Sequence, residues 1–258
     1  MCYETTARPP RPPIAGGAGA TTRELELTSA DGTRFDAFSA TTDAPDAPGM
    51  VILPDVRGLH GFYKDLAVRF AEAGIHAAAF DYFARTAGAG TPRDDDFEWM
   101  PHVMQTKPEQ IAADVAATVA LVRSAEGGGA KSVFTVGFCF GGRNSFNQAA
   151  QDHGLAGVVG FYGVVGASER YPEATAPINL AASYRCPVLG LFGGADPGIP
   201  AADVERFGEA LDAAGIEHEL HSYDGAPHSF FDRAQEQFQK ESDDAWRRIL
   251  AFVAAHAG

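Results

Sequence analysis

Apolar and polar stretches alternate along the chain in a way that predicts strands alternating with helices. Apolar runs of strand length occur at residues 50–54, 75–81, 131–137, 155–162, 187–193 and 218–223. Between them, apolar residues recur at helical spacing over residues 61–74, 108–125, 141–152, 201–214 and 242–255. Strands that alternate with helices form a mostly parallel sheet with helices on both faces. The predicted fold class is therefore α/β.

The first part of the chain follows a different pattern. Residues 8–22 are rich in Pro, Gly and Ala, which predicts an extended arm over residues 1–22. Residues 23–28 and 33–40 then read as two strands joined by a turn at Asp31-Gly32, an antiparallel hairpin at the start of the sheet. A chain of 258 residues suits one large domain, here residues 23–258. The stretch from Arg85 to Lys107, rich in Gly and acidic residues, is predicted to be a long loop.

Reactive or polar side chains follow four of the predicted strands. They are Asp55, Cys139, Asp196 and His228. Open α/β sheets bind ligands at the carboxyl ends of their strands, so these four positions are the first candidates for a site.

Cys139 stands at the centre of the sequence Gly137-Phe138-Cys139-Phe140-Gly141-Gly142. This is the spacing of a nucleophile elbow, G-x-S-x-G, with Cys in place of Ser. A strand precedes the motif and a helix follows it, as the motif requires. The start of that helix places N–H groups and a positive dipole end beside the sulfur, which favours the thiolate. The other two cysteines, Cys2 and Cys186, are expected to be structural or incidental.

The partners of this nucleophile follow from chain order, which in α/β-hydrolases is nucleophile, acid, histidine. Asp196 follows the strand at 187–193, and His228 follows the last strand. Of the eight histidines, His228 alone lies in the loop that this order demands. In such a triad the histidine moves the proton and the acid fixes the imidazole tautomer. The backbone N–H groups of Phe140 and Val56 are predicted to form the oxyanion hole.

The chain resembles the dienelactone hydrolase family, also called carboxymethylenebutenolidases. The resemblance covers nearly everything from residue 23 onward and rests on the segments 81–85, 137–142, 161–164, 193–196 and 225–230. It implies an α/β-hydrolase fold and a Cys–His–Asp triad. It also implies a compact monomer that hydrolyses lactones or activated esters without a metal or cofactor.

The resemblance also implies which residues bind the substrate. Arg85 matches a substrate-binding arginine of the family, and Tyr162 lies in a matching segment. Asp55 stands where the family often has a Glu that contacts the nucleophile. The family's second substrate-binding arginine follows the catalytic histidine by four positions. Here that position is Asp232, and Arg233 comes one residue later.

Composition narrows the range of partners. The formal net charge is −14, and a field of that sign repels nucleic acids and anionic membranes. The three cysteines show no zinc spacing, and a disulfide framework is not expected in a chain of this size. No stretch approaches the apolar length of a membrane span, and the first residues lack a signal-peptide core. We expect a soluble, cytoplasmic enzyme that acts on a small molecule.

Three alternatives share parts of this pattern. A general carboxylesterase would use the same triad without needing a carboxylate on the substrate. A non-catalytic binding protein of the same fold would carry the triad as a vestige. A thiol redox protein would need a resolving cysteine, and none lies near Cys139 in the sequence.

Overall fold

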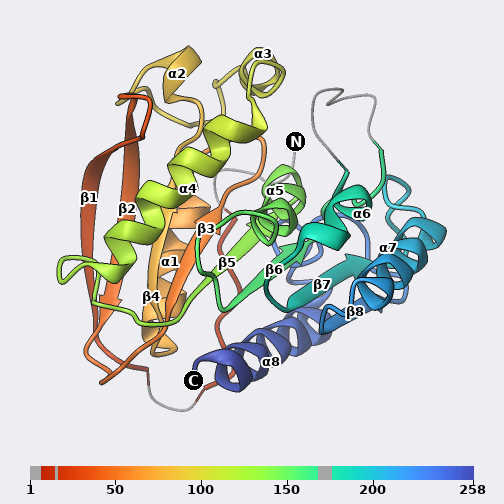
Figure 1. The fold of residues 1–258 in the computed structure, drawn as a ribbon. Helices are drawn as coiled ribbons and strands as arrows, with labels where there is room; N and C mark the ends of the chain where they lie inside the picture. The colour runs from red at the N-terminus through yellow and green to blue at the C-terminus, as the bar shows by residue number, and fades with distance from the viewer. Residues whose placement is uncertain (1–6, 15–16, 168–175) are drawn as a thin grey trace.

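The computed structural model describes residues 7–14, 17–167 and 176–258, which form one sheet with helices on both sides (Figure 1). The sheet has eight strands in the order β1-β2-β4-β3-β5-β6-β7-β8. In chain order they are β1 (Ala20–Thr28), β2 (Arg34–Thr42), β3 (Gly49–Leu53), β4 (His76–Phe80), β5 (Val133–Phe138), β6 (Gly157–Phe161), β7 (Val188–Gly193) and β8 (His218–Tyr223). The pairs β1–β2 and β2–β4 are antiparallel, and every other neighbouring pair is parallel.

The helices follow the predicted alternation with the strands. They are α1 (Gly61–Glu72), α2 (Ala84–Ala87), α3 (Trp99–Val103), α4 (Pro108–Arg123), α5 (Phe140–Gln148), α6 (Pro177–Leu180), the 3₁₀ turn η1 (Ala181–Ser183), α7 (Ala201–Ala213) and α8 (Gln239–His256). Rings of α1 and α8, Phe70 and Trp246, lie 4.9 Å apart, so these two helices share one face. The chain crosses from β4 over β3 to β5 through α4, and α4 contacts α5 on the other face.

The predicted fold class and the N-terminal hairpin are both confirmed. Strands β3 to β7 are buried at every position, as expected for strands covered on both faces. The hairpin turns at Asp31-Gly32, where Gly32 has a φ of 84°. The prediction of a loop from Arg85 to Lys107 is corrected by two short helices: α2, which begins one residue before that stretch, and α3, which lies within it.

The described residues of the Pro-rich arm lie against the helices of one face. Three of its prolines are buried. The indole N–H of Trp246 on α8 donates to the carbonyl of Pro10 at 3.0 Å. Ala18 N–H donates to the carbonyl of Glu72, at the end of α1, at 3.0 Å. The arm therefore contacts both helices before it enters the sheet at Ala20, three residues earlier than predicted.

We expect Trp246→Phe to lower the free energy of unfolding by about 1–2 kcal/mol, measured by urea denaturation. Trp246 is fully buried, so the change removes a hydrogen bond from a buried carbonyl and leaves a small void. The matched control is Trp99→Phe in α3, which is half-buried and should cost less. Equal losses in the two variants would show that the bond to Pro10 adds no stability.

Candidate active site

The backbone turns sharply between β5 and α5, and Cys139 occupies the turn. Its φ of 56° and ψ of −113° lie where residues with a side chain are seldom found. Cys139 N–H donates to the carbonyl of Phe161 at 3.0 Å, and Arg143 N–H donates to the carbonyl of Cys139 at 3.1 Å. These two bonds hold the strained residue between β6 and the first turn of α5. The thiol is half-buried.

The glycines of the motif let three backbone segments approach one another. A Cβ on Gly137 would lie 1.9 Å from the carbonyl oxygen of Gly141, and one on Gly141 would lie 2.1 Å from that of Leu53. No side chain fits at either position, so the start of α5 is packed directly on the end of β3. The buried residues Phe140 and Val56, predicted to supply the oxyanion hole, belong to these two adjoining segments.

His228 and Asp196 meet beyond the ends of β7 and β8. His228 Nδ1 lies 2.5 Å from Asp196 Oδ2, while Asp196 Oδ1 accepts the Gly198 N–H at 2.8 Å. The Asp196 side chain is 3% exposed and that of His228 is 30% exposed. A carboxylate held in this way fixes the imidazole so that Nε2 is the nitrogen left to exchange protons with a reacting group.

Tyr162, just after β6, lies between the strand of the nucleophile and the histidine loop. Its ring centroid is 6.2 Å from that of Phe138, the residue before Cys139, and 4.8 Å from that of His228. Its hydroxyl donates to Asp232 Oδ2 at 2.6 Å. The structure thus brings Tyr162, predicted to bind substrate, into contact with the predicted catalytic histidine.

Two buried carboxyl groups lie near this cluster. Asp55 is fully buried, and its Oδ1 accepts the backbone N–H of Arg57 at 2.9 Å. Asp232 is 1% exposed, and burial, reinforced by the charge of Asp55, raises its pKa to about 7. The Tyr162 hydroxyl and His228 oppose that shift. Sequence reasoning did not propose a role for Asp232; the available signal is one acidic residue directly after two phenylalanines at 230–231.

The guanidinium of Arg85 lies in a separate cluster of ion pairs. It binds both carboxylate oxygens of Asp114 on α4, at 2.6 and 2.8 Å, and Asp31 at 2.9 Å. Asp31 lies in the turn between β1 and β2, and three strand spacings separate β2 from β5, roughly 14 Å. The structure therefore brings Arg85 to the hairpin and α4. Its substrate-binding role stays a prediction.

Arg233, the other predicted substrate-binding arginine, is exposed. It lines a crevice of about 360 Å³ between residues 232–237 and the N-terminal arm, together with Ala7 and Arg8. Its substrate-binding role also stays a prediction.

Two other arginines attach the 85–107 segment to the site. Arg57, next to Val56, pairs with Asp95 at 2.5 Å, and Arg93 pairs with Asp81 at 2.8 Å. The side chains of Arg57, Arg93 and Asp81 are almost fully buried. The Arg57 pair fixes the segment against the loop that follows β3, and the Arg93 pair fixes it against the end of β4.

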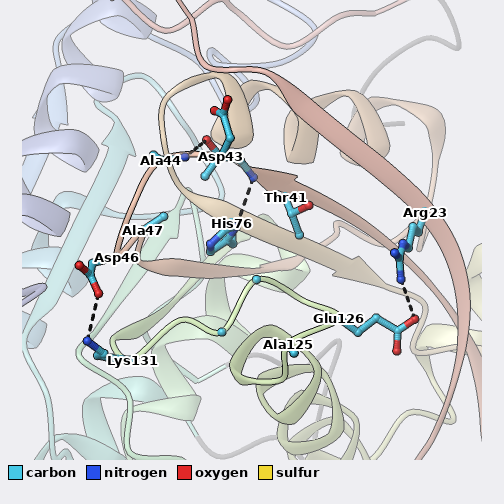
Figure 2. Close-up of a pocket in the computed structure, with 13 residues that line it drawn as sticks. Arg23, Thr41, Asp43, Ala44, Asp46, Ala47, His76, Ala125, Glu126 and Lys131 are labelled. Atoms are coloured by element: carbon cyan, nitrogen blue, oxygen red, sulfur yellow. Dashed lines mark hydrogen bonds and ion pairs between the residues drawn. The ribbon is translucent and has the colours of Figure 1, made fainter.

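A separate polar crevice of about 410 Å³ lies at the opposite edge of the sheet, where β3, β4 and β5 begin (Figure 2). Two ion pairs lie within it: Arg23 with Glu126 at 3.1 Å, and Lys131 with Asp46 at 3.0 Å. None of the predicted site residues lines this crevice. Within the described part of the chain, no three His, Cys, Asp or Glu side chains are grouped as metal ligands, and no helix is long and apolar enough to cross a membrane.

Residues 35–257 match the model of the dienelactone hydrolase family. The chain belongs to this family. Two relatives, provisionally named carboxymethylenebutenolidases, come from Methylorubrum extorquens and Salmonella typhimurium, and each is 29% identical to this chain. The first alignment covers 88% of this chain and 78% of the relative, and the second covers 93% and 90%.

A crystal structure from Klebsiella pneumoniae, provisionally described as a dienelactone hydrolase, is 26% identical, with a TM-score of 0.80. The match covers 92% of this chain and 99% of that one. As a member of the dienelactone hydrolase family, the protein is a hydrolase, and its α/β-hydrolase fold agrees with that of its structural neighbours.

We expect Arg85→Ala to destabilise this dienelactone hydrolase family member by about 3 kcal/mol, because it leaves the fully buried Asp114 without its cation. The matched control is Arg23→Ala. Arg23 and its partner Glu126 are each 53% exposed, so that change should cost at most about 1 kcal/mol. Thermal or urea unfolding measures both. An Arg85→Ala protein as stable as the parent would mean that the ion pairs do not stabilise the fold.

Proposed function

We propose that the protein hydrolyses lactones or activated esters, with Cys139 as nucleophile, His228 as general base and acid, and Asp196 as the group that orients His228. The observation that carries the proposal is the left-handed backbone of Cys139 at the start of α5. Such strain persists only where the surrounding structure enforces it, and it is concentrated at functional sites. The 2.5 Å contact between His228 and Asp196 supports the other two roles.

In the acylation step, His228 Nε2 takes the thiol proton and Cys139 Sγ attacks the carbonyl carbon of the substrate. Negative charge develops on the carbonyl oxygen, and the N–H groups of Phe140 and Val56 stabilise it. The tetrahedral intermediate then expels the alcohol or enol oxygen, which takes the proton from His228. The product of this half-reaction is an acyl thioester on Cys139.

In the deacylation step, His228 removes a proton from water as the water oxygen attacks the thioester carbonyl. The C–S bond breaks, the carboxylic acid leaves, and the proton returns to the sulfur. Asp196 keeps the imidazole in one tautomer and stabilises its cation through both steps. The two steps together consume one substrate molecule and one water molecule and regenerate the thiol of Cys139.

The thiol restricts the substrate. A thiolate is a better leaving group than an alkoxide, so the intermediate formed from a simple alkyl ester tends to return to the ester. An enol ester or enol-lactone expels a stabilised enolate, and acylation then goes forward. We therefore infer that enol-lactones and activated esters are better substrates than alkyl esters, and that amides are poor ones.

One observation favours the general carboxylesterase as a second candidate. The guanidinium of Arg85 already binds Asp31 and Asp114, so a substrate carboxylate would have to compete with two acidic partners. A carboxylated enol-lactone and its uncharged analogue separate the two candidates. The dienelactone-type enzyme is supported if the parent has a higher kcat/KM for the carboxylated compound and Arg85→Lys loses this preference. Equal values support the general esterase. A failure to turn over p-nitrophenyl acetate would support the non-catalytic or redox alternatives.

We expect iodoacetamide to inactivate the enzyme in step with alkylation of Cys139. Peptide mass mapping measures the alkylation of each cysteine. Cys186 is the internal control, because burial raises the pKa of its thiol to about 12 and keeps it protonated. Cys139→Ala should abolish turnover of p-nitrophenyl acetate. Inactivation that tracks Cys186 instead would contradict the proposed nucleophile.

We expect Asp196→Asn to retain the fold and to lose on the order of 10⁴-fold in kcat, the size of the loss known for the corresponding change in a serine protease. An amide in place of the carboxylate favours the wrong imidazole tautomer and does not stabilise the cation. The control is Asp224→Asn, an exposed residue on the same side of the sheet that should leave kcat unchanged. Near-normal activity in Asp196→Asn would assign the orienting role to another carboxylate.

A further inference from the structure

Asp232 is a buried acid that the proposed triad does not use. It lies four residues after His228 and is 1% exposed. One of its oxygens accepts the hydroxyl of Tyr162 at 2.6 Å, and the other accepts the backbone N–H of Arg233. A carboxyl group buried this deeply is costly unless its charge or its hydrogen bonds are used.

Tyr162 connects this acid to the histidine. Its φ of 36° is unusual for a residue with a side chain, and its N–H donates to the carbonyl of Leu191 at 2.8 Å. The backbone is thus fixed at one end of the residue and the hydroxyl at the other. The ring between them lies with its centroid 4.8 Å from that of His228, at 53° to the imidazole plane.

We propose that Asp232 is a positioning residue for His228, which holds Tyr162 against the imidazole and, as an anion, stabilises the imidazolium that accompanies the Cys139 thiolate. The inference rests on the proposed function of Cys139 and His228. It adds a second carboxylate to the site. Asp196 contacts the imidazole directly, whereas Asp232 acts through Tyr162 and through its charge.

Among the described residues, Arg8, Arg233 and Glu236 line the crevice beside Asp232, and three further groups lie close to it. Asp55 faces it from the loop after β3, Tyr162 from the end of β6, and His228 from its own loop. The next residue, Arg233, is exposed and contributes its backbone N–H. Burial and the charge of Asp55 raise the pKa of Asp232 to about 7, against the hydrogen bond from Tyr162 and the attraction of His228.

The sign of the pH dependence follows from these contacts. Below about pH 7, Asp232 is protonated and gives the imidazolium no support. Above it, the carboxylate is ionised and favours the imidazolium–thiolate pair. The rate at which Cys139 reacts should therefore increase near pH 7, where Asp232 loses its proton.

The test measures alkylation of Cys139 by iodoacetamide from pH 5.5 to 8.5 in the parent and in Asp232→Asn. The amide removes the charge; its oxygen can still accept the Arg233 N–H, and its NH2 group can donate to the Tyr162 hydroxyl oxygen in place of accepting from it. Dividing the parent's rate by the variant's rate removes the pH dependence that the two proteins have in common. We expect a ratio near one at pH 6 that rises to roughly threefold to tenfold at pH 8, because one pKa unit of charge interaction is a factor of ten. A ratio that is the same at every pH would assign Asp232 a merely structural role and overturn the proposal.

Tyr162→Phe is a second test, which shifts the pKa of Asp232 without removing its charge. It keeps the ring against His228 and removes the hydroxyl that lowers the pKa of Asp232. The rise in Cys139 alkylation should move upward by about one pH unit. Asp224→Asn removes an equal charge from an exposed position and should leave the curve unchanged. An unmoved rise in Tyr162→Phe would contradict the link between Tyr162 and Asp232.

The readout also separates this inference from the proposed function. Alkylation requires no substrate, so it reports on the thiol even if no ester is turned over. A pH-dependent ratio in a protein that hydrolyses no ester would refute the proposed function and keep the role of Asp232. A flat ratio in an active esterase would refute the role of Asp232 alone.

Discussion

Close packing of bare backbone around Cys139 is the constraint on which the site depends. A left-handed, non-glycine residue costs about 1–3 kcal/mol, and the cost is met because β5, α5 and β3 approach closely at Gly137 and Gly141. The same approach places the start of α5 beside the end of β3 and the loop that follows it. The histidine and acid loops arrive at the same edge because parallel strands end together.

Charge in this protein is arranged in a way that its net value of −14 does not reveal. Two arginines at or near the ends of the segment 85–107 are bound to carboxylates: Arg85 to Asp114, and the buried Arg93 to Asp81. The acids nearest His228 face an imidazole instead. Under the proposed mechanism, these surroundings would favour a positive charge on His228 and give an anionic substrate little attraction.

The sequence was sufficient for the features that depend on neighbouring residues. The strand, turn and helix around Cys139 are encoded within about a dozen positions, and His228 and Asp196 could be chosen because each follows a strand. Arg85 could not be placed in this way, because its partners Asp31 and Asp114 are 54 and 29 residues away. The helices α2 and α3 escaped prediction for a related reason: they are short and are held by contacts with other segments. The environment of Asp232 likewise depends on Tyr162, 70 residues earlier.

The bond between Pro10 and Trp246 joins positions 236 residues apart. While the chain is being synthesised, the early segment is complete long before its partner exists, so this bond is among the last that can form. Until then Phe70 on α1 lacks the indole that covers it in the finished fold. A nascent chain that has not reached α8 therefore exposes an apolar surface on one face of a nearly complete sheet, which is where a chaperone or an aggregating neighbour would bind.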